Sequence, residues 1–389
     1  MKLPLIAMYI TFSVFAMTNV CSTIFLSVYV WKQQESFFMI SAFYFFTFLF
    51  VFIGVMVGAF FMFWFGSRWT FLCSSFTALG MYLFFWTEGE LSLQAVALAG
   101  ILNGLFIGLF YAGFNFYSLW FASQERLSNV LSLQYIINGV MQIVVPPIIG
   151  WIIFVYSYHV FFVTALLILL VQACCSSLIP QVRIRFPFRR KEFFIPLEEG
   201  MKGLGFSSAA YGFFLSFIHM SLGVFVYLYV QNEWALGGWN MLFACISVFT
   251  YYMLGRTFLK PFGDVLGMIG VIISTAATLT LFFHVPVTYI VFNTVISASL
   301  PMLWVPAFTQ HFHHIFALGK ASSANTLTKV MQLLVFREFS ICIGKLSFIA
   351  LLLFQILYFS PSLSLIVFFL CFMPVAIYVL GHKDKGLMS

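Results

Sequence analysis

Long apolar runs recur along the whole chain, and they constrain its fold more than any other feature. Each run holds about 20 or more residues and ends at a cluster of charged residues, Gly or Pro. A helix of that length crosses the ~30 Å hydrocarbon layer of a bilayer. Hydrophobic residues make up 63% of the 389 residues, which is more apolar surface than a soluble domain of this length can bury. The sequence therefore predicts an all-α integral membrane protein.

The breaks between runs predict twelve membrane helices in two sets of six. The first set falls in residues 1–180, a basic segment follows at 181–206, and the second set falls in 207–389. Two junctions, at residues 158–159 and 284–286, are very short, so eleven or thirteen crossings also fit the sequence. The predicted helices cover residues 4–30, 37–65, 70–86, 93–119, 130–157, 159–179, 208–230, 239–258, 264–284, 286–308, 326–357 and 362–381.

Positive charge is unevenly distributed over the predicted loops. With the N-terminus inside, every Lys and Arg of a predicted loop except Lys32 lies on the inner side. Cytoplasmic loops carry such an excess, so both termini are expected in the cytoplasm. The net charge of +7 follows from this topology, and no nucleic-acid partner is expected. Because the chain has no Asn-x-Ser/Thr sequon, a bacterial plasma membrane is favoured, with the basic run Arg183–Lys191 against anionic lipid headgroups.

Two short elements recur at almost the same spacing in the two sets. Gly58–Gly66, at the end of the second predicted helix, has Gly at both ends and Phe before the last Gly. Gly255–Gly263, at the end of the eighth, has the same form 197 residues later. Residues 128–131 and 324–327, at the starts of the fifth and eleventh helices, share Asn and Leu at an offset of 196. The repeat predicts two parallel six-helix halves, as in many secondary transporters.

Over essentially its whole length the chain resembles the major facilitator superfamily of transporters. Between its second and third helices that family carries the motif Gly-x-x-x-Asp-x-x-Gly-Arg-Arg/Lys. Residues 59–68 match it at Gly66 and Arg68, whereas Ala59 and Phe63 replace the first Gly and the Asp. A tight turn needs a residue free to adopt positive φ, so Gly66 is expected to do so. The alternative is an ordinary cytoplasmic turn that uses Gly-Ser-Arg.

The fifth predicted helix offers a second partial match. Antiporters of this family tend to carry Gly-Pro-x-x-Gly-Gly, and residues 146–151 match it at Pro147 and Gly150. This resemblance favours export. Pro146 and Pro147 remove two backbone donors and predict a kink, which serves either a moving gate or simple packing.

Polar residues inside the predicted helices are candidates to line a substrate cavity. Gln134, Asn138 and Gln142 recur every fourth residue and form one stripe. Such a stripe either contacts substrate or joins neighbouring helices by hydrogen bonds. In the family, helices 1, 4, 7 and 10 line the transport path. The single polar residues on those helices are Asn19, Asn103, His219 and Asn293.

Helix 11 holds the charged residues that stand out most in so apolar a chain. Arg337 and Glu338 lie near its middle, and they share one broad face with Gly344 and Lys345. Ionisable groups at that depth are costly and commonly mark ion or substrate paths. Glu338 is therefore the leading candidate for proton binding, paired with Arg337 or near an anionic ligand. His219 is a second candidate because imidazole titrates near neutral pH. A structural ion pair and a packed core His are the alternatives.

The sequence carries no phosphate loop, and its seven Cys show no disulfide or zinc spacing. The His311–His314 tract, placed in a loop after helix 10, is not expected to bind a metal, and no cofactor is expected. The prediction is a monomeric secondary transporter that works by alternating access, most favourably by proton-coupled efflux of a small amphipathic compound. The alternatives are an importer of sugars, amino acids or other metabolites, or a flippase of lipid-linked substrates. A membrane-embedded transferase is less favoured, so enzymatic activity is not expected.

Overall fold

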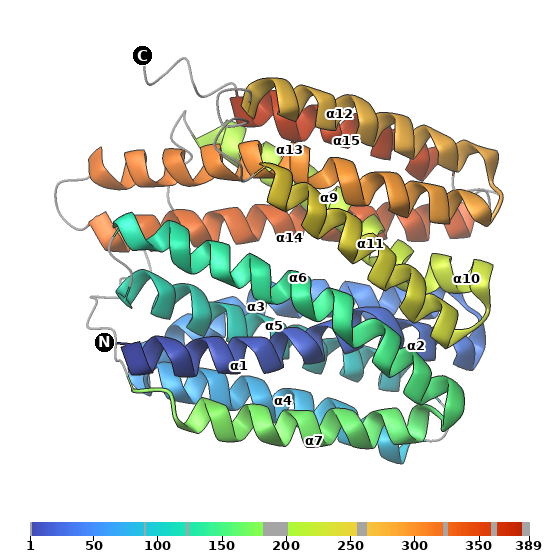
Figure 1. The fold of residues 1–389 in the computed structure, drawn as a ribbon, viewed down its shortest axis with the longest axis horizontal. Helices are drawn as coiled ribbons and strands as arrows, with labels where there is room; N and C mark the ends of the chain where they lie inside the picture. Colours follow the sequence, from blue (N-terminus) through green and yellow to red (C-terminus); the bar gives the residue numbers. More distant parts are fainter. Residues whose placement is uncertain are drawn as a thin grey trace. The chain divides into compact units, whose positions relative to one another are not determined.

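The computed structural model describes residues 2–88, 91–121, 124–181, 201–254, 263–321, 326–358 and 364–382. These residues are almost entirely helical and include no strand (Figure 1). Ten of their helices are long and apolar enough to cross a membrane. α11 (Glu233–Leu254) and α15 (Ser364–His382) bring the total among the described residues to twelve helical rods. The prediction of a multi-pass helical membrane protein with about twelve spans is confirmed.

The first six rods follow the predicted ranges closely. Rod 1 is continuous through α1 (Lys2–Cys21), the π-helical segment η1 (Ser22–Leu26) and α2 (Ser27–Gln34). The remaining five are α3 (Phe37–Trp64), α4 (Ser67–Thr87), α5 (Leu93–Phe121), α6 (Gln124–Val155) and α7 (Tyr158–Ser177).

The second six begin with another interrupted rod. Rod 7 consists of α9 (Met201–Met220), the π-helical segment η2 (Ser221–Phe225) and α10 (Val226–Val230), and α11 is rod 8. The others are α12 (Gly263–Leu279) with the 3-10 turn η4 (Thr280–Phe283), α13 (Val287–Ala321), α14 (Thr326–Tyr358) and α15.

The two short junctions are real helix ends, each marked by a residue with positive φ. Ser157, with φ 149°, separates α6 from α7, and His284, with φ 53°, ends η4 before α13. Some predicted boundaries were wrong. α11 begins at Glu233, before the predicted start at residue 239, and α13 continues to Ala321, so the His311–His314 tract lies within a helix and not in a loop. Polar residues there resemble a loop in composition, yet helical hydrogen bonding continues through them. Gly255 and most of the basic segment, residues 182–200, lie outside the described residues.

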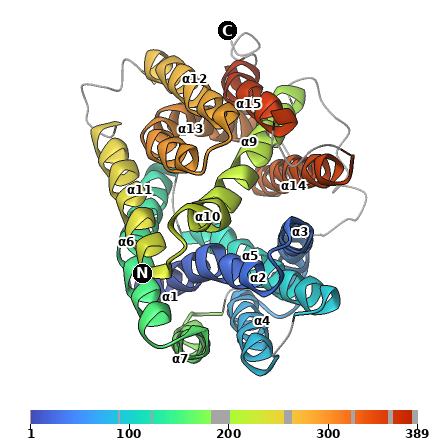
Figure 2. The same cartoon turned by 90° about the vertical axis from the view of Figure 1, so that its right-hand side faces the viewer.

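Helix pairing repeats between the two sets. α1 packs on α6 and α7, as α9 packs on α14 and α15. In the same way α4 packs on α5 and α7, and α12 packs on α13 and α15, as Figures 1 and 2 show. Both interrupted rods contain a five-residue π-helical segment and end at a left-handed residue, Glu35 and Gln231, 196 residues apart. The architecture is therefore pseudo-symmetric, with the offset that the sequence repeat predicted.

Glycines and phenylalanines hold the first set together. α5 approaches α3 at Gly100, Gly104 and Gly108, where an added Cβ would overlap the α3 backbone. Such small residues let helices pack closely in a bilayer, where water does not drive association. Phe15 and Phe110 stack with ring centroids 3.7 Å apart in the buried interior.

By contact the chain divides into two compact units that do not coincide with the sequence halves. The first unit contains residues 1–185 and Leu222–Cys245, and the second contains Phe186–Ser221 and residues 246–389. α10 and the first half of α11 thus pack with the first set, although they belong to the second set in sequence.

Candidate functional site

The charged residues of α14 form a compact pair in the second unit. Arg337 Nη1 donates to Glu338 Oε1 over 3.0 Å, and this ion pair joins adjacent residues of one helix. The side chain of Arg337 is 7% exposed and that of Glu338 is 30% exposed. The pairing expected from the sequence is present, and Glu338 presents the more accessible carboxylate edge.

Aromatic rings from α13 enclose the guanidinium group. The Arg337 Cζ atom lies 4.7 Å from the centroid of the Phe308 ring and 5.9 Å from that of Trp304. Trp304 in turn stacks on Tyr211 of α9, with ring centroids 3.5 Å apart and planes 10° apart. The planar, weakly hydrated guanidinium suits such a ring face. These contacts fix Arg337 and, through the ion pair, orient Glu338.

Lys345 and His219 complete the group. Gly344 lies directly against the backbone of Ala209, so α14 and α9 approach each other without an intervening side chain. That contact brings the half-buried Lys345 within electrostatic reach of both His219 and Glu338. Glu338 thus acts electrostatically on Lys345, and Lys345 acts on His219. We refer to Arg337, Glu338, Lys345 and His219 together as the α14 charge cluster.

Asn293 connects α13 to the π-helical segment of rod 7. Its Nδ2 atom donates to Ser221 Oγ and to the Tyr289 carbonyl oxygen, each over 2.7 Å. The residue is fully buried, and no hydrogen-bond partner of its Oδ1 atom is found among the described residues. An interhelical hydrogen bond of this kind stabilises the helix bundle. Because only the Nδ2 atom of Asn293 takes part in it, the Oδ1 atom remains available as an acceptor.

The predicted polar residues of the first unit lie in different environments. Asn103 is 3% exposed, and its Oδ1 atom has no hydrogen-bond partner in the described part of the chain. Asn19 is half-buried on α1. On α6, Gln134 and Asn138 are half-buried and Gln142 is exposed. The α6 stripe is thus partly exposed, most of all at Gln142.

The loop between α3 and α4 has the conformation expected of it. Gly66 adopts φ 93° and ψ 170°, a region that side chains with a Cβ rarely enter. Arg68 Nε donates to the Ile179 carbonyl oxygen over 2.9 Å, and Gln181 Nε2 donates to the Phe65 carbonyl oxygen over 2.6 Å. These bonds tie the loop to the end of rod 6. Of the corresponding glycines of the second half, Gly263 begins α12 and Gly255 lies outside the described residues.

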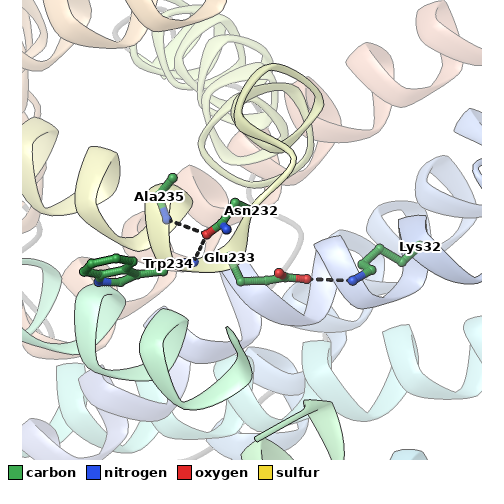
Figure 3. A network of polar contacts seen from close by, with 5 residues as sticks. All are labelled: Lys32, Asn232, Glu233, Trp234 and Ala235. Carbon is green, nitrogen blue, oxygen red and sulfur yellow. Dashed lines mark hydrogen bonds and ion pairs between the residues drawn. The ribbon is translucent and has the colours of Figure 1, made fainter. Parts of the chain in front are cut away.

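Sequence reasoning missed a second ion pair, which Figure 3 shows in the first unit. Lys32 Nζ lies 2.7 Å from Glu233 Oε1. Glu233 is only 8% exposed, although the predicted helix ranges 208–230 and 239–258 leave it in a loop between them. The Lys32 ammonium also lies 5.4 Å from the ring centroid of Tyr158 and 5.8 Å from that of Tyr227. The sequence did offer one signal for this pair: Lys32 and Glu233 are each an isolated charge beside the end of an apolar helix, one in each half.

The start of α11 is held in place by a side-chain cap. Asn232 Oδ1 accepts hydrogen bonds from the backbone N–H groups of Trp234 and Ala235, over 2.9 and 3.0 Å (Figure 3). Asn is a preferred residue at this position because it satisfies N–H groups that the first helical turn leaves unbonded. The cap fixes the first turn of α11 and thereby the direction in which the Glu233 side chain projects.

The prolines predicted on α6 lie against this same end of α11. Both Pro146 and Pro147 lie within the continuous helix α6. An added Cβ on Gly237 would overlap the Pro146 carbonyl, and one on Gly150 would overlap the carbonyl of Glu233. The predicted gate residues of rod 5 therefore form a backbone-to-backbone contact with rod 8, next to the Lys32–Glu233 pair.

Comparison with known proteins places this geometry in a fold family. No protein-family model and no curated protein sequence matches the chain. The crystal structure of a D-xylose-proton symporter superimposes with a TM-score of 0.71 at 13% identity, covering 97% of this chain and 96% of that one. A crystal structure of the peptide transporter POT in complex with sulfate gives a TM-score of 0.66 at 12% identity, covering 99% and 94%. The chain therefore has the fold of these solved transporters, which is the fold expected from its resemblance to the major facilitator superfamily.

Proposed function

We propose that the protein is a secondary active transporter that works by alternating access, in which an ion gradient drives the movement of a small molecule. The fold is that of solved transporters, one of them named as a proton symporter. The protein is not proposed to be an enzyme. By the distribution of Lys and Arg, the Lys32 end of the helices faces outward and both termini face the cytoplasm.

One observation carries the mechanism: at the Lys32 end, parts of both sequence halves are packed into one unit. α10 and the start of α11, from the second half, contact the first half through the Lys32–Glu233 pair, Gly150 and Gly237. Such a contact closes one side of a two-half transporter. In alternating access, the halves separate at this end when they close at the other.

Proton coupling is proposed at the α14 charge cluster. Glu338 is a half-buried carboxylate within a membrane span; it pairs with Arg337 and acts electrostatically on Lys345, which in turn acts on His219. A carboxylate that gains or loses a proton at this position changes the charge of the cluster by one unit. That change is the link between proton binding and substrate binding that coupled transport needs.

Two directions of transport are supported by different observations. The partial antiporter motif at Pro147 and Gly150 supports export of a small amphipathic compound in exchange for protons. The excess of positive charge within the α14 span supports uptake together with protons, because protonation of Glu338 removes the one carboxylate of that span and makes its net charge more positive. The two are distinguished by whether internal pH falls or rises when substrate is supplied outside.

Labelling of the closed end tests alternating access. Ser27 is fully buried at this end, where it lies against Gly223. In a cysteine-free background reconstituted in vesicles, Ser27→Cys should react slowly with an impermeant maleimide from outside. The combined substitutions Lys32→Met and Glu233→Gln should accelerate that reaction, whereas Ser92→Cys, exposed in the loop before α5, should react quickly in both backgrounds. Equal labelling rates for the Ser27→Cys protein with and without the ion pair would exclude this end as a gate.

Proton movement tests the coupling. Vesicles with an internal pH indicator and an imposed pH gradient should move protons only when a transported compound is present. Glu338→Gln should abolish this movement while the protein stays folded and inserted. Proton movement at the wild-type rate in the Glu338→Gln variant would show that Glu338 does not carry the coupled proton and has a structural role.

A further inference from the structure

The ammonium group of Lys32 lies among side chains of three other rods in the first unit. Its Nζ atom is 2.7 Å from Glu233 Oε1 and lies over the rings of Tyr158 and Tyr227, 5.4 and 5.8 Å from their centroids. Lys32 belongs to α2, Tyr158 to α7, Tyr227 to α10 and Glu233 to α11. We call Glu233, Tyr158 and Tyr227 the Lys32 cage. Aromatic rings around a cation are a means by which proteins recognise organic ammonium ions, and a carboxylate adds an ion pair.

The two partners of the ion pair differ in how freely they can leave it. The Lys32 side chain is 43% exposed, whereas that of Glu233 is 10% exposed. Lys32 can therefore turn into the outer solution, while the Asn232 cap keeps the start of α11, and with it Glu233, in place. A buried carboxylate without a cationic partner is costly. When Lys32 leaves, the cage is a site for another cation.

The sequence offers no second permanent cation on the outer side. In the predicted topology the outer loops contain four carboxylates, Glu35, Glu88, Glu90 and Glu233, against a single Lys or Arg, Lys32. This surplus of negative charge attracts cations and raises their concentration near the outer ends of the helices. A replacement for Lys32 must therefore come from the solution.

The contents of the cage indicate which kind of cation fits. The Lys32 side chain is itself a primary alkylammonium group, so the cage already accommodates one. Ring faces attract organic cations but supply none of the oxygen ligands that hard metal ions require. The Tyr158 Oη atom is buried and makes no hydrogen bond of ordinary geometry within the described residues. A ligand that is not tethered to α2 can approach this oxygen and donate to it, because an ammonium group has three N–H donors.

We propose that the Lys32 cage is a binding site for an organic ammonium ion from the outer solution, which takes the place of Lys32. Lys32 is then a tethered competitor for the site. Its displacement breaks the ion pair between α2 and α11, so the bound ion favours opening of the outer end.

This assignment rests on the proposed function for the side of the membrane that the cage faces and for the effect of its occupation. Binding is measured on the full-length protein in detergent, where neither is needed. An absence of binding would refute the ammonium site and leave transport standing. An absence of transport in vesicles would leave the site standing.

Four additives of different charge give a direct test. n-Butylammonium matches the Lys32 side chain, n-butanol and n-butyrate are its neutral and anionic counterparts, and NaCl controls for ionic strength. The readout is the ligand-dependent rise in the unfolding temperature of the wild-type protein. We expect saturable stabilisation by n-butylammonium alone. Equal stabilisation by any of the other three, or no saturable effect of n-butylammonium below about 100 mM, would overturn the proposal.

Substitutions locate the site. Lys32→Ala removes the tethered competitor and should lower the dissociation constant of n-butylammonium by about tenfold or more, because a tethered group acts at high effective concentration. Tyr227→Leu should raise the constant about two- to fivefold through loss of one ring, and Glu233→Gln should abolish saturable binding. Glu88→Gln is the matched control: it removes an exposed carboxylate at the end of α4 and should leave the constant unchanged.

Two outcomes would contradict the assignment. A dissociation constant for Lys32→Ala that equals or exceeds the wild-type value would show that Lys32 does not compete for the site. If Lys32→Ala does not fold, Glu233→Gln decides, because it removes the buried charge instead of leaving it unpaired. A folded Glu233→Gln protein that binds n-butylammonium as the wild type does would exclude the Lys32 cage.

Discussion

The backbone of Gly237 in α11 runs directly against the carbonyl of Pro146 in α6, with no room for a side chain between them. Gly238, the next residue, has open space where a Cβ would be. Two adjacent glycines in one helix therefore differ in what they can accommodate.

We expect Gly237→Ala to lower the free energy of unfolding by about 1–3 kcal/mol, because two helix backbones must move apart. Gly238→Ala should be neutral or stabilising by up to about 1 kcal/mol, since Ala favours the helix more than Gly does. Chemical unfolding of the two variants in the same detergent measures the difference. Equal effects would show that the α6–α11 contact does not form in the folded protein.

The Lys32–Glu233 pair should behave as a single unit. Lys32→Met leaves a carboxylate that is only 8% exposed without its partner, which should cost about 1–2 kcal/mol of stability. Lys32→Glu should cost more because it places two carboxylates together. The exchange of both residues, Lys32→Glu with Glu233→Lys, should recover most of the loss. A double-mutant cycle on unfolding free energies measures this coupling, and Glu88→Gln, at the exposed end of α4, serves as control.

The turn between α3 and α4 should tolerate only glycine at residue 66. Gly66→Ala forces a Cβ into the backbone conformation of φ 93° and ψ 170°, at a cost of about 1–3 kcal/mol. Gly80→Ala is the matched control, because Gly80 lies in α4 with nothing within 4 Å of an added Cβ. Unfolding temperatures that fall equally for both variants would contradict a conformational role for Gly66.

Arg337 should not be replaceable by lysine. Arg337→Lys keeps the charge but loses the planar group that lies 4.7 Å from the Phe308 ring. We expect a double-mutant cycle of Arg337→Lys with Phe308→Leu to give a coupling free energy of about 0.5–1 kcal/mol. The same cycle with Phe339→Leu, on the exposed face of α14, should give a coupling near zero. If the Phe308 cycle also gave none, the ring would not hold the guanidinium.

The helical rods were predictable because each membrane span must satisfy its backbone polar groups within one apolar segment. Positive φ at Gly66 was predictable for a similarly local reason, namely a turn of very few residues. Arg337 and Glu338 are sequence neighbours, so their pairing needed no knowledge of the tertiary fold.

Long-range and subtle backbone features were not predictable from the sequence. Lys32 and Glu233 are 201 residues apart, and only the packing of α10 and α11 with the first set brings them together. The Tyr211–Trp304 stack likewise joins two rods whose side-chain directions depend on helix rotation. The π-helical segment Ser22–Leu26 has an ordinary apolar sequence that an α-helix would accept equally well.

That π-helical segment also sets the rotational phase of the end of rod 1. A π-helical hydrogen bond spans one residue more than an α-helical one, so the segment contains a residue that a regular helix would not need. One residue corresponds to about 100° of rotation around an α-helix. Without it, Lys32 would point about a quarter turn away from Glu233. Deleting one residue from Ser22–Leu26 would therefore separate the ion pair while leaving both of its side chains in the sequence.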